Sequence, residues 1–267
     1  MLALSSSAST QHDKQAIADA FGKAAQTYDQ HAAFQRDVGQ RLLDQMPADL
    51  QGKVVLDLGC GTGYFSHELF KRGARVICAD LSPDMLRVSR QRCGRERMRY
   101  VQVDAERIPF GASSVDYVFS SLALQWCDDL AVPLAEIRRV LKPQGQAYFS
   151  TLLDGSLHEL KTAWSKIDAY QHVNEFISVN QLNIALAQAG CHRHHLDLPT
   201  VTVWYQRAFD LMRDLKGIGA NHVNGRSHGL TNRKALLQVE HAYRAFENHN
   251  GLLPASYQVC LGVISHD

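Results

Sequence analysis

Apolar and polar positions follow two rhythms along this 267-residue chain. Compact apolar runs are typical of parallel strands buried on both faces, and apolar positions spaced by three or four residues are typical of helices packed on one face. The runs predict strands at residues 53–58, 75–79, 98–103, 115–120 and 146–152. The helical spacing predicts helices at residues 63–72, 83–92 and 130–141. This strand–helix alternation predicts an α/β fold with a doubly wound, mostly parallel sheet.

After residue 154 helical segments become more frequent than strands. The pattern there predicts helices at residues 155–170, 179–189, 209–218 and 231–248, and strands at residues 201–205 and 257–264. We therefore expect a disordered N-terminus (1–12), N-terminal helices over the functional site (13–50), a sheet core (51–154), and the remaining strands with an appended helical lobe (155–267, the lobe being about 155–176 and 207–250).

The composition excludes several classes of protein. Lys and Arg number 28 against 27 Asp and Glu, so the net charge of +1 argues against a nucleic-acid partner bound chiefly through phosphates. The six cysteines are scattered without a C-x-x-C pair, so no metal site and no disulfide framework is expected. The chain shows no membrane-spanning apolar run and no secretory leader, which predicts a cytoplasmic protein.

The strongest chemical signal is a glycine-rich turn after the first predicted strand. Residues 54–63 read VVLDLGCGTG, so Gly59, Gly61 and Gly63 stand at alternate positions before a helix. Glycine permits a tight turn and close approach of a ligand, and the helix N-terminus offers unpaired N–H groups. A dinucleotide fingerprint has the spacing G-x-G-x-x-G, and here Tyr64 occupies the place of its third glycine.

Three acidic residues accompany this turn. Asp57 precedes it, where a carboxylate could accept hydrogen bonds from an ammonium group. Asp80 ends the second predicted strand, where a carboxylate can accept both hydroxyls of a ribose. Asp104 follows the third strand. Together they favour a nucleoside with an amino-acid end.

These features resemble the Rossmann-like class I S-adenosylmethionine methyltransferases over residues 50–152. The resemblance implies S-adenosylmethionine as cofactor, with Asp57 at its amino-acid end, Asp80 at the ribose and Asp104 at the adenine amino group. It implies cofactor contacts by Tyr28, Asp57, Gly59, Gly61, Gly63, Asp80, Leu81, Asp104, Ala105 and Leu122.

The flanking segments indicate the acceptor. No Asn/Asp-Pro-Pro-aromatic tetrapeptide follows the fourth strand and no Pro-Cys pair occurs, which disfavours nucleic-acid methylation. Segments 20–32, 211–222 and 251–259 resemble the malonyl-acyl-carrier-protein O-methyltransferases of biotin synthesis, although Gln144 stands where the superfamily usually has glycine. The resemblance implies methylation of the free carboxylate of a malonyl thioester. That carboxylate is ionised at neutral pH, so no general base is expected.

The acceptor carboxylate is expected to need a cationic partner, for which guanidinium has the best geometry. Arg226 is the first candidate, with Lys216 and Arg233 behind it, although each could equally be a solvated surface charge. Tyr28 takes its role from the resemblance, which implies that it covers the cofactor and orders the acceptor. Gln125 and Trp126 could line the methyl-transfer pocket or simply pack there.

A basic face is predicted for residues 207–234, which could dock an acidic acyl carrier protein. It has six basic residues against Asp210 and Asp214, the basic ones being Arg207, Arg213, Lys216, Arg226, Arg233 and Lys234. A chance cluster of charge remains the alternative. For the function itself, the sequence leaves open another small-molecule methyltransferase such as a quinone C-methyltransferase, a nucleotide-dependent oxidoreductase, or a cofactor-binding module without catalysis.

Overall fold

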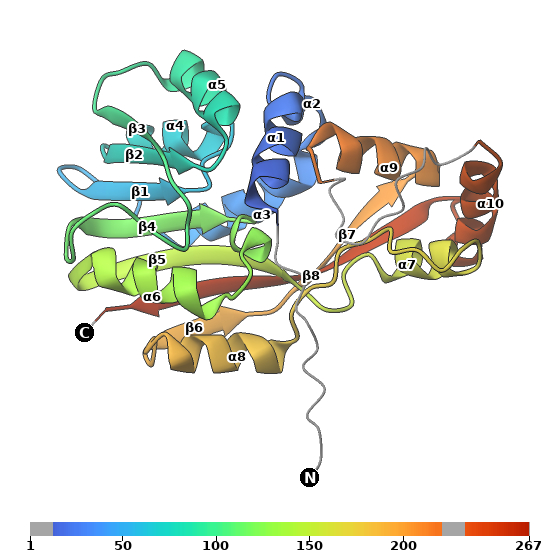
Figure 1. Cartoon of the computed structure of the whole chain (residues 1–267). Helices are drawn as coiled ribbons and strands as arrows, with labels where there is room; N and C mark the ends of the chain where they lie inside the picture. Colours follow the sequence, from blue (N-terminus) through green and yellow to red (C-terminus); the bar gives the residue numbers. More distant parts are fainter. Residues whose placement is uncertain (1–12, 221–232, 267) are drawn as a thin grey trace, which may run out of the picture.

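The computed structural model describes residues 13–220 and 233–266 (Figure 1). The strands are β1 (Val54–Leu58), β2 (Arg75–Asp80), β3 (Met98–Gln102), β4 (Val115–Ser121), β5 (Leu141–Leu153), β6 (His194–Asp197), β7 (Thr200–Tyr205) and β8 (Leu253–Ser265). The α-helices are α1 (Lys14–Ala24), α2 (Tyr28–His31), α3 (Ala33–Asp44), α4 (Tyr64–Lys71), α5 (Pro83–Cys93), α6 (Ala131–Val140), α7 (His158–Ser165), α8 (Val179–Gln188), α9 (Ala208–Gly217) and α10 (Arg233–Tyr243). Two 3₁₀ turns, η1 (Leu124–Trp126) and η2 (Arg244–Phe246), complete the described elements.

The strands form one twisted sheet in the order β3-β2-β1-β4-β5-β8-β6, with β7 paired to β8. β1 to β5 are parallel, and β8 runs antiparallel to its neighbours β5, β6 and β7. The chain builds outward from β1 to β3 and then returns to add β4 on the other side of β1. Ligands of such sheets bind beyond the carboxyl ends of the strands at this reversal. The predicted doubly wound α/β fold is confirmed.

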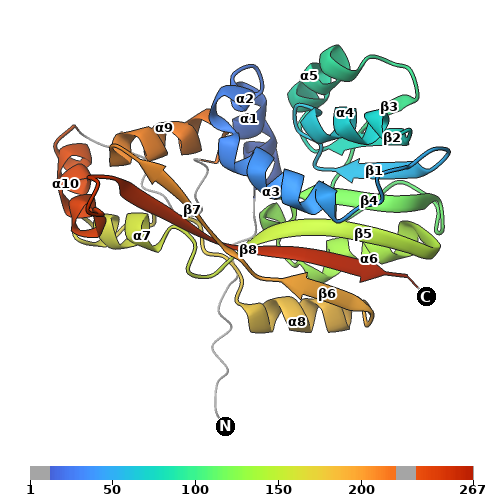
Figure 2. The ribbon, with the colours of Figure 1, turned by 180° about the vertical axis from the view of Figure 1, so that it is seen from behind.

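Helices cover both faces of the sheet (Figure 2). On one face α3, α4 and α5 bury apolar side chains such as Val38, Leu42 and Leu69. On the other face α6 and α8 bury Leu134 and Leu182. Because both faces are covered, the parallel strands are apolar along their length, which explains why their sequence shows compact runs.

The long strand β8 joins the sheet to a second group of helices. Its later part pairs with β5 and β6, and residues 253–258 pair with β7 as a two-stranded ribbon. This ribbon extends beyond the sheet and carries α7, α9 and α10 around it (Figures 1 and 2). Tyr243 of α10 is fully buried there, and its hydroxyl donates to the carbonyl of Pro254.

Several boundaries in this region differ from the prediction. β8 begins at Leu253, four residues before the predicted strand, and α7 begins at His158 instead of residue 155. The residues before α7 are tied to β8, because the N–H of Leu157 donates to the carbonyl of Ser256 and the N–H of Gln258 donates to the hydroxyl of Ser156. These long-range bonds leave no local signal in the sequence. No helix in the described ranges is long and apolar enough to cross a membrane.

The short helices α1 and α2 lie between α5 on one side and α9 on the other (Figure 1). Gly217 of α9 lies against the ring of His31, so close that a Cβ there would come 2.2 Å from its Cδ2. His31 Nδ1 pairs with the carboxylate of Asp214 at 2.8 Å. The N-terminal segment therefore bridges the sheet and the helices carried by the ribbon.

Candidate active site

The glycine turn after β1 has three glycines with positive φ, but they serve different purposes. A Cβ on Gly59 would lie 2.3 Å from that of Ala123, and one on Gly63 would lie 2.3 Å from the hydroxyl of Ser89. Both positions are therefore closed by protein packing. Around Gly61, by contrast, a Cβ would meet nothing within 4 Å. The space beside Gly61 belongs to a pocket.

This strand-end pocket lies at the carboxyl ends of the first four strands and spans about 770 Å³, part of which is open to solvent. It is lined by Lys14, Ile17, Phe21, Tyr28, Leu58, Gly59, Gly61, Asp80, Leu81, Met85, Val103, Asp104, Ala105, Ser121, Leu122, Ala123, Trp126 and Cys127. Most of the walls are apolar, and the two carboxylates on them come from the ends of β2 and β3.

Asp80 is fixed in this pocket by backbone hydrogen bonds. Its Oδ2 accepts from the N–H of Gly61 and its Oδ1 from the N–H of Ser82, both at 2.8 Å. Burial raises the pKa of this carboxyl above its ordinary value, and the two backbone N–H groups oppose part of that effect. Each oxygen keeps a further lone pair that can accept from a ligand hydroxyl.

Asp104 is held by a lysine from the other end of the sequence. Lys14 Nζ, in the first turn of α1, donates to Asp104 Oδ2 at 2.6 Å and also contacts Glu106. Burial lowers the pKa of Lys14, but its bonds to the two carboxylates outweigh burial, and the pKa is raised overall. The α1 segment is thereby anchored over the pocket.

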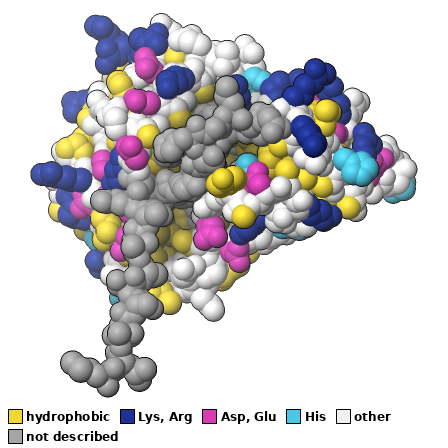
Figure 3. Space-filling view, turned by 45° about the vertical axis from the view of Figure 1, so that its right-hand side comes forward, with side chains coloured by type: hydrophobic (Ala, Val, Ile, Leu, Met, Phe, Trp, Pro, Cys, Tyr) yellow, Lys and Arg dark blue, Asp and Glu magenta, His cyan; other side chains and the backbone are white. Residues whose placement is uncertain are grey.

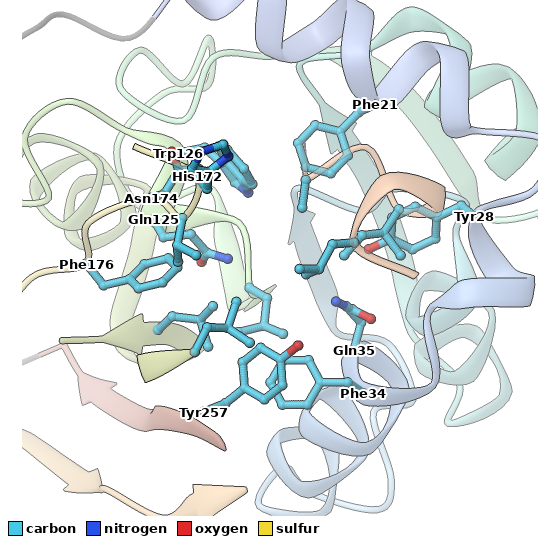
Figure 4. Close-up of a pocket in the computed structure, with 17 residues that line it drawn as sticks. Phe21, Tyr28, Phe34, Gln35, Gln125, Trp126, His172, Asn174, Phe176 and Tyr257 are labelled. Atoms are coloured by element: carbon cyan, nitrogen blue, oxygen red, sulfur yellow. The ribbon is translucent and has the colours of Figure 1, made fainter. Parts of the chain in front are cut away.

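A second cavity, the apolar pocket, adjoins the first and encloses about 660 Å³ (Figure 4). It is lined by Phe21, Tyr28, Phe34, Gln35, Leu122, Gln125, Trp126, Leu152, Leu157, His172, Val173, Asn174, Phe176, Leu215, Ile218, Ala220 and Tyr257. The pockets share four of these residues, namely Phe21, Tyr28, Leu122 and Trp126.

The four shared residues form the boundary between the pockets. Phe21 and Trp126 meet edge to face, with ring centroids 5.2 Å apart. Leu122 has a φ of 51°, a left-handed conformation that L-residues seldom adopt outside functional sites. Burial raises the pKa of Tyr28 well above its ordinary value, so its hydroxyl stays protonated and can donate at this boundary.

Comparison with known proteins identifies the family. Residues 56–149 match the family model described as a methyltransferase domain. The malonyl-acyl-carrier-protein O-methyltransferase of Serratia marcescens is 46% identical, over 94% of this chain and 96% of that protein. The chain belongs to the malonyl-acyl-carrier-protein O-methyltransferase family. The resemblance seen in its flanking segments is confirmed, and the oxidoreductase alternative is set aside.

Two further comparisons concern a longer relative and a solved structure with the same fold. The biotin biosynthesis bifunctional protein BioHC of Cellvibrio japonicus is 45% identical over 92% of this chain, which spans only 49% of that longer protein. The YcgJ protein of Bacillus subtilis has a TM-score of 0.58, covering 86% of this chain and 98% of its own. At 17% identity that likeness shows the fold alone.

The methyltransferase family implies S-adenosylmethionine as the cofactor, and the strand-end pocket fits it. The open space at Gly61 admits a ligand against the backbone, and Asp80 is preset to accept two hydroxyls of a ribose. Leu81 and Ala105 supply apolar walls for a base beside Asp104. When bound, this cofactor supplies a methyl group activated by a sulfonium.

The structure does not bring every predicted cofactor residue to the pocket wall. Gly63 begins α4 and packs on Ser89. Asp57 is 2% exposed and accepts a 2.5 Å hydrogen bond from the hydroxyl of Ser66, behind the glycine turn. Its burial raises its pKa to about 7, to which the charge of Asp80 adds, whereas the Ser66 bond opposes the rise.

The raised pKa of Asp57 predicts how stability depends on pH without cofactor. Between about pH 4 and pH 7 the folded protein holds a proton that the unfolded chain has lost, so the free energy of unfolding falls as pH rises through this window. Asp57→Asn keeps an acceptor for Ser66 and should remove the part of the fall that Asp57 causes, making the variant more stable than wild type by about 2–4 kcal/mol near pH 8. Urea unfolding at both ends of the window measures this. Equal pH dependence in variant and wild type would contradict it, and Asp44→Asn, at an exposed site, is the control.

Two of the three predicted carboxylate partners lie outside the lining of the apolar pocket. Lys216 is exposed on α9 and Arg233 is exposed at the start of α10, and neither lines the apolar pocket. Arg226 lies outside the described residues. Within the described chain, the apolar pocket has no lysine or arginine in its lining.

Sequence reasoning missed several pocket residues. Lys14, Gln35 and His172 all line one of the two pockets, and His172 stacks on Trp164 with its Nε2 bonded to Asp168 at 2.8 Å. None belongs to a motif. A seven-residue spacing between Tyr28 and Gln35 would suggest one helix face, but the two residues lie in separate helices, α2 and α3, which are interrupted at Ala32.

Proposed function

We propose that this protein transfers a methyl group from S-adenosylmethionine to the free carboxylate of a malonyl thioester carried by an acyl carrier protein. The 46% identity over nearly the full length of the Serratia protein carries this proposal. The two adjoining pockets support it, because one suits a nucleoside and the other an acyl chain, and the boundary between them is where a methyl group must pass.

The chain would catalyse the reaction chiefly by placing and desolvating the reactants. Asp80 and the backbone at Gly61 fix the donor, while the apolar pocket directs the malonyl group toward Tyr28 and Trp126. The bound donor would supply a methyl group on a sulfonium, and the ionised carboxylate would be the nucleophile, so no side chain of this protein would have to remove a proton. Exclusion of water strips the carboxylate of solvent and strengthens its attraction to the sulfonium. The ester that forms is uncharged, so it resembles an ordinary fatty-acyl primer.

The test is to incubate the purified protein with S-adenosylmethionine and malonyl-acyl carrier protein and to detect the methyl ester by mass spectrometry. We expect ester formation together with one equivalent of S-adenosylhomocysteine. If calorimetry shows cofactor binding but no ester forms, the acceptor is another small molecule and the proposal fails.

We place the carrier protein on a groove between α1 and α9. The groove is open to solvent and is lined by Lys23, Arg213 and Lys216 among others. Arg213 and Arg207 both pair with Asp210, so their charge is partly neutralised, whereas Lys23 and Lys216 are exposed without an ion pair in the described chain. Figure 3 shows Lys and Arg side chains gathered at the upper right of the molecule. The same two helices send Phe21 and Leu215 into the apolar pocket.

Charge reversal tests this placement. Lys23→Glu combined with Lys216→Glu should raise KM for malonyl-acyl carrier protein about 10-fold or more, because two attractions to an acidic partner become repulsions. The effect should shrink at high salt, and affinity for S-adenosylhomocysteine should not change. Lys71→Glu, on exposed α4, is the matched control. An unchanged KM in the double variant would show that the carrier protein docks on another part of the surface.

A further inference from the structure

Two carboxamides in the apolar pocket lack hydrogen-bond partners. The Oε1 atoms of Gln35 and Gln125 are buried, and neither amide bonds to any described residue. Figure 4 shows their amide ends pointing into the cavity from opposite sides. Their amide nitrogens are turned toward the cavity, whereas each Oε1 is turned away from it. N–H groups placed in this way on two sides of one apolar cavity can donate to a ligand that presents acceptor oxygens.

Both glutamines are held in place by their neighbours. Gln125 lies in η1 between Leu124, which is buried, and Trp126, which borders both pockets. Gln35 follows Phe34, whose ring stacks on Tyr257 with centroids 3.9 Å apart. The backbone that carries each glutamine is therefore fixed by packing, close to the boundary that the methyl group crosses.

No cationic side chain and no free imidazole of the described lining is available to hold an anion. As described above, no lysine or arginine of the described chain lines this pocket. The ring of His172 is committed to Trp164 and Asp168. Each carboxamide, in contrast, can donate two N–H bonds, and a carboxylate accepts about four.

We propose that Gln35 and Gln125 hold the malonyl carboxylate through their uncharged amide groups. This inference rests on the proposed function. During the transfer the negative charge of the carboxylate disappears, so a guanidinium partner would bind the reactant more tightly than the transition state and slow the reaction. Neutral donors orient the carboxylate without neutralising it, so its negative charge interacts with the positive charge of the sulfonium. They also reject acetyl thioesters, which would leave both amides without partners.

The test is to replace each glutamine by methionine and by glutamate. Methionine keeps the shape without donors, and we expect kcat/KM for malonyl-acyl carrier protein to fall about 10- to 100-fold in each single variant, with a raised KM. Glutamate is nearly isosteric but repels the substrate, so Gln125→Glu should be more damaging than Gln125→Met. A packing role alone predicts the opposite order. Affinity for S-adenosylhomocysteine should stay at the wild-type value.

Gln40→Met provides the control, because Gln40 is exposed on the same helix as Gln35. Wild-type protein that forms no ester would refute the proposed function. Active wild type with unchanged kinetics in the methionine variants, or glutamate variants as active as wild type, would refute this inference alone. Loss of malonyl binding in Arg226→Gln while the glutamine variants stay active would also overturn it and favour the cationic partner predicted from the sequence.

Discussion

Asp80→Ala is expected to lower affinity for S-adenosylmethionine by about 100- to 1,000-fold, because the bonds of one carboxylate to two hydroxyls are lost. The same change frees the N–H groups of Gly61 and Ser82, which now donate to this carboxylate. The glycine turn therefore loses its fixed shape together with its acceptor. Calorimetric titration with S-adenosylhomocysteine measures the loss directly.

Two further variants separate these contributions. Asp80→Asn keeps one acceptor oxygen and should lose less affinity than Asp80→Ala. Asp44→Ala, at an exposed position on α3, should bind as wild type does. Near-normal binding by Asp80→Ala would show that the carboxylate does not contact the cofactor, and the placement of the donor in the strand-end pocket would have to be abandoned.

Gly61→Ala is expected to leave the fold intact and yet lower cofactor affinity about 100-fold. Its φ of 53° is open to alanine at a cost of about 1 kcal/mol, and a Cβ there meets no protein atom within 4 Å. The methyl group would instead occupy space that the cofactor needs. Thermal unfolding should therefore show a stability close to that of the wild type, whereas calorimetry on the same sample should show weakened cofactor binding.

Gly52 offers a matched control for this variant. It too has a positive φ, 75°, with nothing within 4 Å of a Cβ, but it lies in the turn before β1 and does not line the strand-end pocket. Gly52→Ala should cost similar stability and leave binding unchanged. If both variants bind the cofactor equally well, the open space beside Gly61 is filled by solvent and is not part of the cofactor site.

The sheet could be predicted because its signal is local. Strands covered on both faces are apolar throughout, and the turn at residues 59–63 and the carboxylate of Asp80 follow directly from strand ends. The ribbon start at Leu253 and the bond of Leu157 could not be predicted, because they depend on pairing with residues about 50 and about 100 positions away in the sequence.

The residues that line the apolar pocket were harder to predict for the same reason. Gln35, Gln125 and His172 converge from three distant segments, and nothing near any of them in the sequence marks the meeting point. The resemblance to a family indicated the acceptor, and the charge of its carboxylate led us to expect basic residues as its partners. Lys216 and Arg233 are exposed and the described walls of the apolar pocket carry no lysine or arginine, whereas Arg226, the first candidate, lies outside the described residues.

The continuity of β8 has a consequence for how this enzyme can be altered. The strand contributes Tyr257 to the apolar pocket and, a few residues later, Cys260 to the interior of the sheet. Deleting the ribbon and helices around the apolar pocket would therefore remove β8 from the sheet that forms the strand-end pocket. The molecule is not modular, and variants with a new acceptor must come from exchanging side chains within a fixed backbone rather than from grafting one part onto another.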